Sequence, residues 1–235
     1  MKQHFDELLY RLKRSLFVLG AVFTVCFYYS NTLYTLVSKP ILTYLPAGTQ
    51  IITTQVTAPF MVPLQLSFIC ALLLCAPYLL YQTWMFVKPG LYKQERDNII
   101  PVILLSCILF YLGILFGTLI ISPIALNFFT NSAPNGVTVM LDIASYLDFI
   151  VTIAFASGIA FQIPVITSLL IRLGIFSKRQ LSSKRKHIIV LAFVLGMLLA
   201  PPDVISQILL ALPMWGLFEF GLLLAPSRLD KIVNS

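Results

Sequence analysis

The sequence has little charge. Only 11% of its 235 residues are Asp, Glu, Lys or Arg, whereas 59% are hydrophobic, and ordinary soluble domains carry roughly 25% charged residues. A water-soluble globule of this composition would lack polar surface, so the sequence predicts an all-α protein embedded in a lipid bilayer. Its formal net charge is +7, but the basic residues gather at the ends of apolar segments without interleaved aromatics, which argues against nucleic-acid binding.

Catalytic and metal-binding groups are also scarce. The two histidines, His4 and His187, lie in basic flanks. The sequence has no HExxH, GxSxG or Walker motif and no paired membrane aspartates. The residues that metal-dependent, nucleophilic or ATP-dependent catalysis requires are therefore missing. The cysteines fall inside apolar segments without ligand spacing and are expected to act as small hydrophobic residues. They are Cys26, Cys70, Cys75 and Cys107. We therefore expect no enzyme, no cofactor and no metal site.

Long apolar runs are abundant. About 20 helical residues cross the roughly 30 Å hydrocarbon core, and we expect six spans in one integral membrane domain, 1–235. The last apolar run, 188–225, is broken by Pro201 and Pro202, and Asp203 is suited to cap the helix that follows. The final two helices are therefore expected to be short. The six predicted spans are about 15–37, 63–86, 99–126, 146–172, 188–201 and 204–225.

The distribution of Lys and Arg predicts the orientation. Fifteen of the 16 basic residues lie in the N-terminal tail, the segments 87–98 and 172–187, or the C-terminus, and Lys39 is the exception. The positive-inside rule then places both termini in the cytoplasm. The opposite connections, 38–62 and 127–145, have lengths that suit a folded outer cap, with disordered loops as the alternative.

Polar residues inside the predicted spans are mostly neutral. Glu219 is the exception, and we favour a carboxylate bonded to a neighbouring helix or reaching the interface over a transport site. Gln162 and Gln207 are expected to form hydrogen bonds from helix to helix. Gln162 also precedes Pro164, which frees a backbone carbonyl and can kink the fourth span.

Two acids flank the membrane on the predicted cytoplasmic side. Glu7 lies in the amphipathic stretch His4–Leu12, and Glu95 lies in Phe86–Arg96. From the residues alone, each acid is expected to neutralise a nearby Lys or Arg, a contact worth about 0–1 kcal/mol when exposed.

At these stretches the sequence resembles the TatC family, the multi-spanning receptor of the twin-arginine protein translocase. The resemblance covers nearly the whole chain, and its specificity comes from the order and spacing of motifs that are individually weak. These motifs are His4–Leu12, Pro40, Ala58–Phe60, Phe86–Arg96, Ala144–Leu147, Phe161–Pro164, Gly196–Gln207 and Phe218–Glu219.

The resemblance implies a cytoplasmic site for signal peptides that carry two consecutive arginines, and export of folded cargo driven by the proton-motive force. Glu7 and Glu95 match the family's signal-binding acids. Carboxylates suit this task because a guanidinium is planar, permanently charged and able to donate two parallel hydrogen bonds. The expected signal-peptide-binding residues are Glu7, Arg11, Phe86, Pro89, Leu91, Tyr92, Glu95 and Arg96.

The resemblance also implies partners and a location. The partners are the single-span TatA and TatB subunits and further copies of the chain, and the location is the bacterial inner membrane. The residues expected at the membrane polar site or at partner contacts are Gln162, Met197, Asp203 and Gln207. Structural roles are expected for Pro40, Pro164, Pro201, Pro202 and Glu219.

Three positions depart from the family pattern. Leu9 stands where an arginine is usual. The family's Glu-Arg-Arg triplet becomes Glu95-Arg96-Asp97. Gln162 replaces a glutamate and cannot titrate. Two other functions remain open: a secondary transporter for a small solute, and a TatC-like paralogue without receptor activity. The scarcity of buried charge and the lack of repeat halves count against the transporter.

Overall fold

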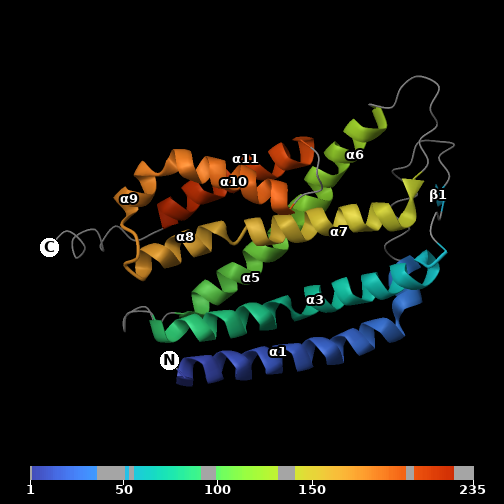
Figure 1. The fold of residues 1–235 in the computed structure, drawn as a ribbon, viewed down its shortest axis with the longest axis horizontal. Helices are drawn as coiled ribbons and strands as arrows, with labels where there is room; N and C mark the ends of the chain where they lie inside the picture. The colour runs from blue at the N-terminus through green and yellow to red at the C-terminus, as the bar shows by residue number, and fades with distance from the viewer. Residues whose placement is uncertain are drawn as a thin grey trace. The chain divides into compact units, whose positions relative to one another are not determined.

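The computed structural model describes residues 2–35, 51–52, 56–90, 99–131, 141–199 and 204–224. Almost all of these residues are helical, as the composition predicts (Figure 1). Internal packing divides the chain into two compact units. Unit 1 comprises Met1–Phe86 and Ser132–Phe149, and unit 2 comprises Val87–Asn131 and Ile150–Ser235. Organisation as a single membrane domain stays a prediction.

Two long helices dominate unit 1. The helices α1 (Lys2–Tyr28) and α3 (Ala58–Val87) lie side by side (Figure 1). The Ser67 hydroxyl contacts the Cys26 carbonyl at 3.4 Å, and the rings of Phe23 and Phe68 meet edge to face. The helix α1 begins well before the predicted span because neither proline nor glycine interrupts the chain ahead of Gly20. The amphipathic N-terminal stretch and the first span are therefore one continuous helix.

An apolar cluster closes the other end of unit 1. Ala58, Val62 and Leu66 of α3 are buried against Ile143 and Leu147 at the start of α7 (Ile143–Ala160). This cluster fixes the first turns of both helices.

A short parallel pairing joins the two connections that were predicted to form an outer cap. Ile51 of β1 (Ile51–Ile52) pairs with Leu141 of β2 (Leu141–Asp142). The Asp142 carboxylate then accepts hydrogen bonds from the Ser145 amide and hydroxyl, at 3.1 and 2.9 Å, which satisfies a free donor in the first turn of α7. The ends of these two connections are helical: 58–62 belong to α3, 127–131 to α6 (Ser122–Asn131) and 143–145 to α7. The remaining parts, 38–50 with Pro40, 53–55 and 132–140, lie outside the described residues.

Unit 2 begins with the turn η1 (Lys88–Gly90) and a long helical run. The run comprises α5 (Ile99–Phe116), the π-helical turn η2 (Gly117–Ile121) and α6 (Ser122–Asn131). Gly113 and Gly117 allow this run to approach α7 closely. A Cβ at Gly113 would lie 2.6 Å from the Ser157 carbonyl oxygen, and a Cβ at Gly117 would lie 2.7 Å from the Ser157 hydroxyl. Small residues at such contacts are typical of membrane helices.

The fourth span is interrupted where the sequence predicts a kink. The helix α7 ends at Ala160, and α8 (Ile163–Arg172) begins after a two-residue turn with Pro164 in its first turn. After the short helix α9 (Lys178–Ser183), α10 (Arg185–Leu199) and α11 (Val204–Leu224) complete the unit. The helix α11 packs against both α8 and α10.

The helices agree with the predicted polytopic fold. In the described part, four stretches are long and apolar enough to span a membrane. They are Ala58–Gly90, Ile99–Thr130, Ile143–Arg172 and Val204–Leu223. With α1 and α10 they overlap the six predicted spans, although α1 begins 13 residues before the first predicted span and ends at Tyr28, before its predicted end at 37. The helix α10 is the shorter of the last two, since its 15 residues extend for about 22 Å.

Candidate functional site

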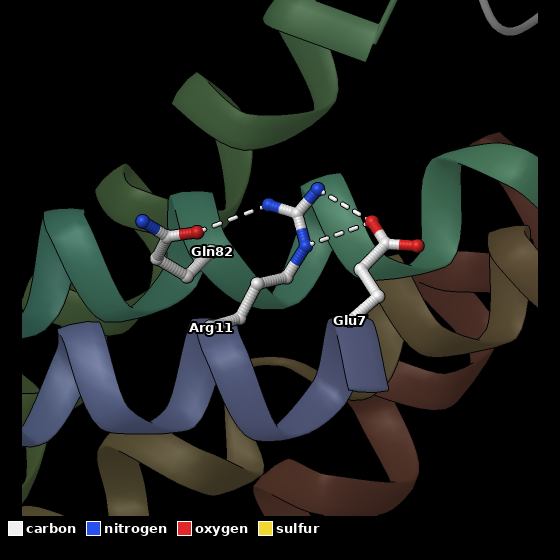
Figure 2. Close-up of polar contacts among 3 residues, drawn as sticks. All are labelled: Glu7, Arg11 and Gln82. Carbon is white, nitrogen blue, oxygen red and sulfur yellow. Dashed lines mark hydrogen bonds and ion pairs between the residues drawn. The ribbon is translucent and has the colours of Figure 1, made fainter. Parts of the chain in front are cut away.

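A charged cluster joins α1 to α3 within unit 1. Glu7 and Arg11 lie one helical turn apart on α1, and Gln82 faces them from α3 (Figure 2). Arg11 donates from Nε and Nη2 to Glu7 Oε1, at 3.0 and 2.7 Å, and from Nη1 to Gln82 Oε1 at 3.0 Å. One guanidinium therefore binds its own helix and the neighbouring helix at once. We call Glu7, Arg11, Gln82 and Tyr78 the Arg11 cluster.

Gln82 links this cluster to α3. Its side chain is buried, and its amide nitrogen donates to the Tyr78 hydroxyl at 2.7 Å while its oxygen accepts from Arg11. Both ends of the amide are thus engaged. A satisfied polar network inside an apolar interface holds its members in fixed orientations, because every alternative leaves a buried group without a partner.

Glu7 retains binding capacity. Its side chain is 35% exposed and that of Arg11 is 22% exposed. Both hydrogen bonds from Arg11 go to Oε1, and Oε2 makes no hydrogen bond or ion pair with the described residues. A carboxylate has about four acceptor positions. The second oxygen can therefore accept a further cation, although Arg11 already neutralises much of the charge.

The structure describes four of the residues predicted to bind signal peptides. Glu7 and Arg11 are brought together in unit 1, Phe86 is half-buried near the end of α3 in the same unit, and Pro89 is exposed in η1 of unit 2. The other members, Leu91, Tyr92, Glu95 and Arg96, lie outside the described residues, as does Asp97.

Sequence reasoning missed Gln82 and Tyr78. The available signal was an amide near the end of the predicted span 63–86, together with a tyrosine four residues earlier. Such an amide needs partners when it is buried in a membrane helix. The sequence did not indicate that Arg11 would be one of them.

Two other amides link helices in unit 2. Gln162, at the α7–α8 break, donates to the Ser106 carbonyl of α5 at 2.9 Å, and Gln207 of α11 donates to the Phe193 carbonyl of α10 at 3.0 Å. Both contacts run from helix to helix, as expected for neutral polar groups in spans. Met197 is strongly exposed near the end of α10. Pro201, Pro202 and Asp203 lie outside the described residues.

Glu219 of α11 is paired with Arg185 at the start of α10. The Arg185 guanidinium contacts both carboxylate oxygens, Nε to Oε1 at 2.7 Å and Nη2 to Oε2 at 2.9 Å. The Arg185 side chain is 52% exposed and the Glu219 side chain is 31% exposed. This bidentate contact links the last two helices and supports the structural role expected for Glu219. Among the described residues, no group of His, Cys, Asp or Glu side chains could hold a metal ion.

The family model and the relatives that match this chain carry the same description. A family model described as Sec-independent protein translocase protein (TatC) matches residues 3–213. The protein of that name from Escherichia coli (strain K12) is 45% identical over 218 residues, covering 93% of this chain and 84% of the relative. The one from Haemophilus influenzae is 46% identical over 222 residues, covering 94% and 87%. These relatives are components of a protein translocase, a transport function rather than catalysis.

Solved structures agree. A crystal structure described as the twin arginine translocase receptor TatC has a TM-score of 0.81 at 33% identity, covering 99% of this chain and 100% of that one. A second, described as the same receptor in DDM, has a TM-score of 0.84 at 34% identity, covering 95% and 99%. The chain therefore belongs to the TatC family of Sec-independent protein translocase proteins.

Proposed function

We propose that this chain is the receptor of a twin-arginine translocase, which binds Arg-Arg signal peptides at the cytoplasmic face of the bacterial inner membrane. Both termini face the cytoplasm, as the Lys and Arg distribution favours. The observation that carries the proposal is the Glu7 carboxylate, which Arg11 and Gln82 hold in place while its Oε2 stays available. Glu95 supplies the second acid. The proton-motive force drives export.

The geometry suits discrimination between arginine and lysine. Because Arg11 already donates to Glu7 Oε1, an incoming cation has to add to Oε2 or displace Arg11. A guanidinium brings a rigid fork of donors, whereas an ammonium is a strongly hydrated point charge. Arg11 therefore competes with any incoming cation for the Glu7 carboxylate. A peptide arginine, with its fork of donors, competes better than a lysine.

Partner subunits dock on α10. The chain scaffolds single-span TatA- and TatB-like subunits on the exposed apolar face of α10, where Val194, Met197 and Leu198 are 47%, 68% and 74% exposed. Asp203 and Gln207, the other residues expected at partner contacts, follow α10 closely in the sequence. The observation that counts against the transporter alternative is that Glu219, its candidate site, already makes one hydrogen bond and one ion-pair contact with Arg185.

The decisive experiment is a crosslinking titration with a signal peptide. Replacing one partner of a partly wet ion pair costs roughly 1–3 kcal/mol, so Glu95→Gln should weaken binding about five- to 150-fold. Glu7→Gln should act in the same direction, and the two losses should be non-additive if both acids serve one arginine pair. Asp6→Asn is the matched control, because Asp6 is exposed beside Glu7, and it should leave affinity unchanged.

A second peptide separates specific contact from general charge balance. If the two arginines of the peptide are replaced by lysines, its weaker binding should respond less to Glu95→Gln, because the bidentate geometry has already been lost. Equal losses for both peptides, at matched protein levels, would refute the assignment of Glu95 as a guanidinium contact.

A further inference from the structure

A basic cavity lies in unit 2 where α9, α10 and α11 meet. Its volume is about 490 Å³, within the range of sites that bind small molecules. Lys178 and Arg179 of α9, Arg185 of α10 and Glu219 of α11 contribute its charged lining, and Leu222 and Leu223 contribute apolar surface. The cavity is distinct from the Arg11 cluster, which belongs to unit 1.

The cavity carries an excess of positive charge. Glu219 is held by Arg185 through both carboxylate oxygens. Lys178 and Arg179 form no ion pair with the described residues, so three cations against one carboxylate leave two positive charges. An anion entering the cavity would meet cations that are already close together.

The backbone around these cations is well anchored. Ser177 caps α9, accepting from the Gln180 amide at 3.2 Å while the Gln180 side chain accepts from the Ser177 amide at 2.9 Å. Leu181 is buried against Phe218 and Leu222 of α11. Lys178 and Arg179 therefore project from a fixed turn, which reduces the entropy that binding would cost.

Apolar surface continues from the cavity onto the outside of α11. Leu222 is buried, but Leu223 is 77% exposed and Phe220 is 45% exposed. In a membrane protein such residues contact acyl chains. A ligand that fits the whole site has an anionic group for the basic wall and hydrocarbon for the exposed face.

We propose that this cavity binds the phosphate headgroup of an anionic phospholipid. The phosphodiester accepts hydrogen bonds from Arg179 and Lys178, and the Ser182 hydroxyl at the rim offers a further donor. Glu219 limits the affinity by engaging Arg185, so the lipid competes with an internal carboxylate. Basic pockets between transmembrane helices are a known chemistry for anionic headgroups.

The test is native mass spectrometry of the full chain in detergent, titrated with phosphatidylglycerol and with phosphatidylcholine. We expect preferential retention of phosphatidylglycerol, and about 30-fold weaker retention in the variant Lys178→Gln/Arg179→Gln, since each basic residue contributes about fivefold. The control Lys13→Gln/Arg14→Gln removes the same charge from exposed positions on α1 and should change retention less than twofold. Equal weakening by both double variants would overturn the site in favour of diffuse attraction.

A change of opposite sign sharpens the test. Glu219→Gln should strengthen retention several-fold by releasing Arg185 to the headgroup, whereas Asp6→Asn, with the same change in net charge, should not. No gain for Glu219→Gln, in protein whose thermal unfolding is unchanged, would contradict the competition. Inorganic phosphate serves as the last arm: if millimolar phosphate displaces the lipid completely, the cavity is a free-phosphate site and the lipid assignment is wrong.

Discussion

Each unit of the molecule contains an arginine–glutamate pair with a shortest contact of 2.7 Å, yet the surroundings of the two pairs differ. In unit 1, Arg11 is 22% exposed and is also bonded to buried Gln82 on another helix. In unit 2, Arg185 is 52% exposed, and the described residues offer it no hydrogen-bond acceptor besides Glu219. Contact distance alone therefore does not reveal what a pair contributes.

The two pairs differ in how much stability they are expected to contribute, because they differ in burial and in the number of hydrogen-bond partners. Leaving a buried polar group without its partner costs about 1–3 kcal/mol, whereas an exposed ion pair contributes about 0–1 kcal/mol. The Arg11 cluster should therefore stabilise the packing of α1 on α3 and hold the proposed receptor carboxylate. The Arg185–Glu219 pair should contribute little to stability and remain available for exchange with another anion.

Gln82→Leu is expected to have the largest effect on stability. It removes the acceptor of Arg11 Nη1 and the donor to Tyr78, so the free energy of unfolding should fall by about 1–3 kcal/mol. Gln207→Leu is the matched control, because Gln207 bonds a backbone carbonyl without any charged partner, and its loss should be about 0.6 kcal/mol. Denaturant unfolding in detergent measures both. Equal losses would contradict the distinction between a charged network and a single amide contact.

Much of this fold follows from the sequence. Hydropathy located the helices, since a span needs about 20 apolar residues, and Pro164 marked the break in the fourth span because proline cannot donate within a helix. Hydropathy did not predict how far α1 extends, because a helix can continue into water where no residue stops it.

The polar partners could not be predicted in the same way. Arg11 and Gln82 are 71 residues apart, and Arg185 and Glu219 are 34 apart, so each contact depends on how helices pack. Sequence spacing supports pairs three or four residues apart on one helix, such as Glu7 and Arg11. The role of Gln82 therefore required the structure.

Gln162→Glu tests whether unit 2 tolerates a carboxyl group without a cation. The Gln162 amide donates to the Ser106 carbonyl at 2.9 Å, and a protonated carboxyl group keeps a donor for that oxygen, whereas a carboxylate would repel it. We expect a folded, assembled protein with a loss of about 1 kcal/mol in unfolding free energy. Gln162→Leu, which removes the donor, should lose at least as much. Complete loss of folding in Gln162→Glu alone would mean that the position admits no acid.

The smallest expected effect concerns the Arg185–Glu219 pair. A double-mutant cycle of Arg185→Gln and Glu219→Gln, measured in detergent without anionic lipid, isolates the coupling between the two side chains. Because both side chains are substantially exposed, solvent screens their attraction, and the coupling should be below about 1 kcal/mol despite the bidentate geometry. A coupling as large as the loss from Gln82→Leu would show that the pair is a main support of the last two helices. In that case exposure would be a poor guide to strength in this protein, and competition between Glu219 and an anionic headgroup would be too costly to occur.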